Sequence, residues 1–162
     1  MQSLIIQIML VMTVICRLSA QDLAPLPEKD PFVGTWRTNP DKCRPKLERK
    51  DASYVRTYAR DGDDILFSSQ NLTPKIKENH YRYRCDGLPH PITYGNMISC
   101  RYRSGKYRSG VLVEGELVDV NIKQTSYWTQ EVSTDGRELI VLGYTDETRT
   151  KLTSVEVMDR VK

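Results

Sequence analysis

The chain has 162 residues, of which 39% are hydrophobic and 28% charged, a composition typical of a globular domain and not of a disordered chain. This length is enough for one domain with a real hydrophobic core. The 24 basic and 21 acidic residues give a formal net charge of only +3, which argues against a nucleic-acid-binding protein.

The first 20 residues predict a secretory leader. Residues 4–16 are apolar apart from two polar side chains, which is too short to span a bilayer and has the length of a signal-peptide core. The small residues Ser19 and Ala20 suit cleavage. We expect residues 1–20 to be a signal peptide, with an uncleaved anchor as the alternative. Cleavage would remove one basic residue, Arg17, and leave a mature net charge of +2.

We therefore expect a secreted or periplasmic protein that has no membrane attachment once the leader is cleaved. Residues 21–29 contain two prolines and no periodicity, so they are interpreted as an extended linker. The folded domain is expected to occupy residues 30–162.

Three cysteines remain after the expected cleavage: Cys43, Cys85 and Cys100. In an oxidising compartment this number predicts one disulfide and one spare thiol. We favour a Cys85–Cys100 bridge because both residues lie in expected strands that flank a turn-rich segment. Closing this loop of about 16 residues would stabilise the fold by about 3 kcal/mol.

The folded domain begins with Asp-Pro-Phe-Val-Gly-Thr-Trp-Arg at residues 30–37. Gly34 allows another backbone to approach closely, and Trp36 supplies a large apolar side chain with one donor. Residues 42–51 are charged and have no apolar stripe, which predicts a loop and leaves no room for the helix pair of fatty-acid-binding barrels.

Strand-forming segments separated by short turns follow this opening. They cover residues 52–59, 65–69, 80–85, 97–102, 110–118, 124–132, 139–144 and 152–158. With the first segment this pattern predicts eight to nine strands and no helix. We expect an all-β fold, an antiparallel up-and-down β-barrel in preference to a sandwich.

Three stretches resemble small secreted lipocalin-like proteins of bacteria, poorly characterised members of the calycin superfamily. They are residues 30–40, 85–92 and 132–139, and the likeness spans most of residues 30–160. The resemblance implies a barrel that binds small molecules. It also implies that Trp36 closes the narrow end of the barrel beneath an arginine from a late strand, either Arg160 or Arg137.

The expected ligand is a small amphipathic molecule in the barrel, held by aromatic and polar side chains that share strand faces. The candidate ligand-binding residues are Tyr54, Arg56, Tyr58, Tyr81, Tyr83, Tyr102 and Trp128. Arg56 would be an inward cation able to pair with a carboxylate or phosphate group. Alternation alone does not decide which strand faces point inward.

Two other functions stay open. In the first, side chains fill the barrel and an Arg/Tyr-rich edge binds an acidic protein partner. The second is an enzyme of unknown class, although no catalytic motif is present and we assign no catalytic residue or cofactor. We also expect no metal site, because the spacing of His80, Cys85, His90 and Cys100 matches no common zinc pattern. The protein is expected to be a monomer.

Overall fold

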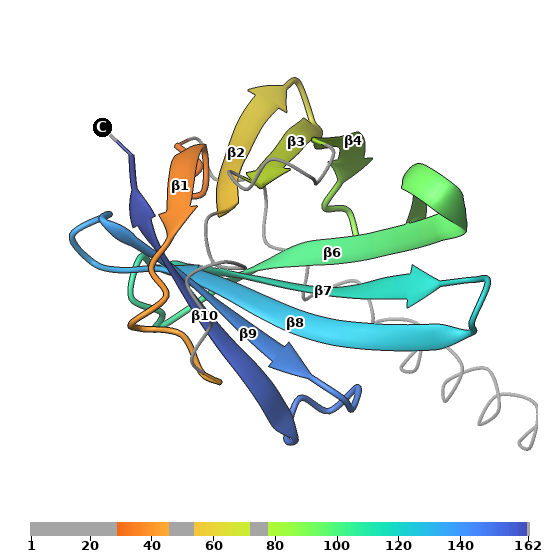
Figure 1. Cartoon of the computed structure of the whole chain (residues 1–162). Coiled ribbons are helices and arrows are strands. Elements are labelled where there is room, and N and C mark those ends of the chain that lie inside the picture. The colour runs from red at the N-terminus through yellow and green to blue at the C-terminus, as the bar shows by residue number, and fades with distance from the viewer. Residues whose placement is uncertain (1–28, 46–53, 72–77, 162) are drawn as a thin grey trace, which may run out of the picture.

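The computed structural model describes residues 29–45, 54–71 and 78–161, which form a single ten-stranded antiparallel sheet (Figure 1). The expected leader and most of the linker lie outside the described residues. The strands are β1 (Gly34–Thr38), β2 (Tyr54–Asp61), β3 (Asp64–Asn71), β4 (Asn79–Arg84), β5 (His90–Pro91), β6 (Asn96–Ser104), β7 (Val111–Asp119), β8 (Gln124–Val132), β9 (Glu138–Tyr144) and β10 (Leu152–Arg160). In the described part of the chain the only helical element is the 3₁₀ turn η1 (Thr93–Gly95).

The strands follow one another around the sheet in the order β4-β3-β2-β1-β10-β9-β8-β7-β6-β5. Only the β1–β10 pairing joins strands that are distant in sequence, so the sheet curls into a nearly closed up-and-down barrel. The all-β barrel prediction is confirmed. The tenth strand, β5, was not expected, because it has two residues and one of them is Pro91.

The disulfide between Cys85 and Cys100 joins the end of β4 to β6, where the barrel closes. Next to it the backbone N–H of Gly87 donates to the Cys100 carbonyl at 2.8 Å, and Asp86 forms an isolated bridge with Arg101. The predicted pairing is confirmed, and Cys43 is a free thiol. The disulfide therefore lies where the backbone hydrogen bonding between neighbouring strands is weakest.

The floor of the barrel is built around Trp36, whose side chain is completely buried. The guanidinium carbon of Arg160 lies 3.9 Å from the centre of the Trp36 ring. Arg160 also donates hydrogen bonds to the carbonyls of Val33 at 2.9 Å, Pro31 at 2.8 Å and Gly136 at 2.7 Å. These bonds tie β10 to the segment before β1 and to the β8–β9 turn.

Gly34 leaves the space that this stack needs. Its φ is +141°, and a Cβ atom there would lie only 2.5 Å from Nη1 of Arg160. Arg137, the other candidate for the stacked cation, has an 84% exposed side chain and pairs with Asp135 instead.

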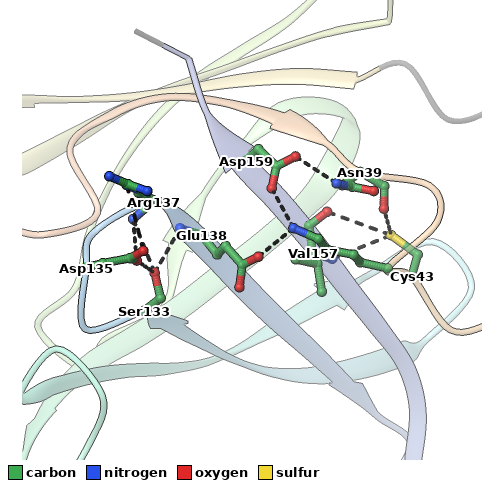
Figure 2. A network of polar contacts seen from close by, with 9 residues as sticks. Asn39, Cys43, Ser133, Asp135, Arg137, Glu138, Val157 and Asp159 are labelled. Carbon is green, nitrogen blue, oxygen red and sulfur yellow. Dashed lines mark hydrogen bonds and ion pairs between the residues drawn. The ribbon is translucent and has the colours of Figure 1, made fainter.

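Residues 39–45 form a strap beside β10, and its backbone is hydrogen-bonded to that of Val155 and Val157 (Figure 2). Asn39 donates to Asp159 at 2.7 Å, and Lys42 bridges Asp159 and Glu138. The buried thiol of Cys43 lies against the backbone of Val157. The strap contains no helix; residues 46–51 of the expected loop lie outside the described residues.

We predict that Arg160→Ala lowers the free energy of unfolding by about 2–4 kcal/mol, because it removes the stack on Trp36 and three hydrogen bonds from a charged donor. Arg137→Ala is the matched control and should change stability by less than about 0.5 kcal/mol, since its side chain is solvent-exposed. Urea unfolding measures both values. Equal effects of the two substitutions would show that the floor does not depend on Arg160.

Candidate ligand-binding cavity

The inward strand faces enclose a cavity of about 390 Å³ above the floor. This volume is within the range of small-molecule sites, which span about 300–1,000 Å³. The cavity is lined by Arg56, Tyr58, Phe67, Ser69, Asn79, Tyr81, Tyr83, Ile98, Leu117, Ser126, Tyr127, Trp128, Gln130, Val141, Gly143 and Glu156. Nine of these sixteen residues are aromatic or aliphatic, six have polar or charged side chains, and one is a glycine.

One wall is a continuous series of aromatic rings on β2, β3 and β4. Ring centres are 5.2 Å apart for Tyr58 and Phe67, 4.6 Å for Phe67 and Tyr81, and 5.8 Å for Tyr81 and Tyr83. Alternate residues of each strand face the cavity, and the strand register brings these rings side by side. The wall is a broad apolar surface with phenol hydroxyls at intervals.

The opposite wall centres on Trp128 of β8. Its two neighbours in register are Gly115 on β7 and Gly143 on β9. A Cβ atom on Gly115 would collide with the indole ring, so this glycine is required for the Trp128 side chain to lie over β7. Sequence reasoning did not identify this arrangement, although the two strand glycines were its visible signal.

A hydrogen bond between opposite sides of the barrel separates the cavity from the floor. The Gln130 side-chain amide donates to the Tyr58 hydroxyl at 3.0 Å, and both residues are buried. Below this bond Tyr102 donates to Asp30 at 2.6 Å, and Arg60 donates to the same carboxylate oxygen at 2.8 Å. Tyr102 therefore belongs to the floor and does not line the cavity.

Arg56 points into the cavity, where it forms an ion pair with Glu156. Nη2 of Arg56 lies 2.9 Å from Oε2 of Glu156, and the hydroxyl of Thr38 donates to Oε1 at 3.3 Å. Burial alone would lower the pKa of Arg56, but the facing carboxylate of Glu156 more than offsets this and raises the pKa. Arg56 is thus a charged group with its own counter-ion inside the protein.

The remaining predicted site residues divide as follows. Arg56, Tyr58, Tyr81, Tyr83 and Trp128 are brought together around one cavity. Tyr54 pairs with Asn71 at the start of β2 and is not part of the lining.

Sequence reasoning missed the other eleven lining residues, among them Phe67, Gln130 and Glu156. Phe67 shares a strand face with Ile65 and could have been found from the same alternation as the tyrosines. Gln130 and Glu156 are polar, so a search for alternating apolar residues does not find them.

The arginines of the expected Arg/Tyr-rich edge lie outside the barrel and have carboxylate partners. Arg82 pairs with Asp61 and Asp64, and Arg84 also pairs with Asp64. On β6, Arg101 and Arg103 both pair with Glu114. This edge is consequently a ladder of ion pairs and not an uncompensated positive surface.

Within the described residues no group of three or more His, Cys, Asp or Glu side chains could hold a metal ion. His80 pairs with Glu78, and His90 lies 2.9 Å from Asp86. None of the helices in the described part of the chain is long and apolar enough to cross a membrane.

No model of a known protein family matches the chain, and no curated protein has a similar sequence. Among solved structures 39 chains match, including the crystal structure of the wild-type fluorescent protein UnaG. Its TM-score is 0.54 at 13% sequence identity, covering 80% of this chain and 97% of that chain. At this identity the likeness shows the fold alone, an antiparallel β-barrel. Membership of the secreted bacterial lipocalin-like proteins stays a prediction.

The buried tyrosines generate a prediction about pH. Burial raises the pKa of Tyr58, Tyr81, Tyr83 and Tyr102 above the ordinary value of about 10. Absorbance titration of the folded protein should therefore show that these four of the nine tyrosines ionise only above the pH range of a free phenol. In urea all nine should titrate together.

The raised pKa values of these four tyrosines also determine how the free energy of unfolding changes with pH. Below pH 10 both the native and the unfolded state hold the phenol protons, so the contribution of these four tyrosines is fully present. As the pH rises above about 10, the unfolded state releases protons that the native state retains, and stability falls. A folded protein whose tyrosines all titrate together near pH 10 would contradict this account.

Proposed function

We propose that this protein binds a small, partly apolar molecule in the barrel cavity and acts outside the cell or in the periplasm. The cavity itself carries the proposal, because it combines an aromatic wall, a facing indole and a few polar groups. Apolar surface supplies most of the affinity in such a site, and the polar groups orient the ligand.

The barrel is not filled by its own side chains at this level. The core below the Tyr58–Gln130 bond is closely packed around Trp36, Leu139 and Met158, all with no measurable exposure. Above that bond, space for a ligand remains between Tyr81 and Trp128. The contrast supports a closed, stabilising end and an open, ligand-binding end.

Export is supported by the expected leader at residues 1–20 and by the disulfide, since disulfides persist in oxidising compartments. The rival function, an interaction module that meets an acidic partner through its arginine-rich edge, is weakened because those arginines already have carboxylate partners.

Titration of tryptophan fluorescence tests the proposal, using a panel of fatty acids, retinoids and small phenolics. We expect at least one member to change the emission and raise the melting temperature. Trp128→Phe should abolish most of the emission change, because the only other tryptophan, Trp36, is sealed in the floor.

Arg56→Ala should weaken binding by about tenfold, since it leaves the carboxylate of Glu156 without its partner in the cavity. Arg82→Ala, which removes an outward-facing arginine, is the matched control and should leave the affinity unchanged. If no member of a broad panel perturbs emission or melting temperature, the filled-barrel interaction module becomes the better account.

A further inference from the structure

The charges in the cavity compensate each other. Among the described residues that line it, only Arg56 and Glu156 are charged, and they are 2.9 Å apart. Their side chains keep 23% and 20% exposure, so both face the space that a ligand would enter. An anionic ligand group that approached Arg56 would also approach the Glu156 carboxylate. It would then lose its hydration and meet a like charge.

The other polar groups of the lining are all neutral: they are phenols, the hydroxyls of Ser69 and Ser126, and the amides of Asn79 and Gln130. Tyr81 and Tyr83 line the cavity, and neither hydroxyl has a hydrogen-bond partner among the described residues. The buried side-chain atoms that lack a partner in the described residues do not include either hydroxyl, so both hydroxyls open into the space that a ligand would enter. An apolar ligand that filled this space would leave the hydroxyls without water, which is costly unless a ligand oxygen accepts their hydrogen bonds.

We infer that the cavity selects an uncharged ligand with an apolar ring system and a carbonyl or hydroxyl oxygen, and that Glu156 is the residue that excludes anionic amphiphiles. This inference rests on the proposed binding function and narrows its ligand class. Tyr81 and Tyr83 would donate hydrogen bonds to the ligand oxygen. Glu156 would keep Arg56 in their ion pair, so that Arg56 does not bind fatty acids or other carboxylates.

Two fluorescent dyes with one skeleton test the charge selection. N-phenylnaphthylamine is neutral, and anilinonaphthalene sulfonate is the same molecule with one added sulfonate. The wild-type protein should bind the neutral dye about tenfold or more tightly than the sulfonate, a difference of about 1.4 kcal/mol. This comparison needs no substitution, so it does not depend on how a variant folds. Energy transfer from the two tryptophans reports binding of each dye to the protein.

Glu156→Gln keeps the shape of the side chain and removes its charge, so Arg56 becomes available to an anion. The affinity for the sulfonate should rise about tenfold, while the affinity for the neutral dye changes little. The double variant Arg56→Gln/Glu156→Gln is the matched control. It removes both charges, so the gain in sulfonate affinity should disappear if the gain is due to Arg56 and not to a loosened cavity.

Benzophenone and diphenylmethane, which differ by a carbonyl oxygen, test the phenol donors by displacement of the neutral dye. The wild type should prefer benzophenone by about tenfold, and Tyr81→Phe/Tyr83→Phe should lose that preference.

Equal binding of the two dyes by the wild type, or an unchanged ratio in Glu156→Gln, would overturn the role of Glu156. A missing preference for benzophenone would overturn the role of the phenols. In each case the binding function itself would stand. If neither dye enters and no compound of the earlier panel binds, the proposed function fails together with the inference.

Discussion

The cation of Arg160 stacked on Trp36 is the contact on which the barrel depends. It joins the last strand to the first, the one pairing in the sheet between strands far apart in sequence. Its three carbonyl partners fix the chain before β1 and the β8–β9 turn beneath the same guanidinium. Because this end is sealed, Phe32 and Asp30 are held under the barrel, and the cavity can remain open only at the other end.

Much of this architecture could be predicted from sequence, because strand faces alternate with a period of two. The alternation placed Arg56 with Tyr58, and Tyr81 with Tyr83, and the structure brings all four to one cavity. The Cys85–Cys100 pairing followed from expected strands with equivalent faces, and the disulfide is confirmed. The sequence pattern alone predicted those contacts that depend only on which face of one strand a side chain occupies.

The arrangement of β10 shows where local pattern fails. Its apolar residues Val155 and Val157 point away from the cavity, and the face that carries Glu156 and the buried Met158 points inward. The strap of residues 39–45 binds this part of β10, with the buried thiol of Cys43 against the backbone of Val157 (Figure 2). These contacts join parts of the chain more than a hundred residues apart, so no pattern within β10 could have indicated them. The pairing of Trp128 with two glycines is non-local in the same way.

The space between the aromatic wall and Trp128 is therefore the central candidate for a ligand site. Nuclear magnetic resonance of the labelled protein with N-phenylnaphthylamine tests it most directly. We expect shift changes at the Trp128 indole, the Gln130 side-chain amide and the Tyr81 ring, with none at the outward-facing Arg82 and Arg101. Changes confined to the outer strands, or no changes at saturating dye, would contradict the account.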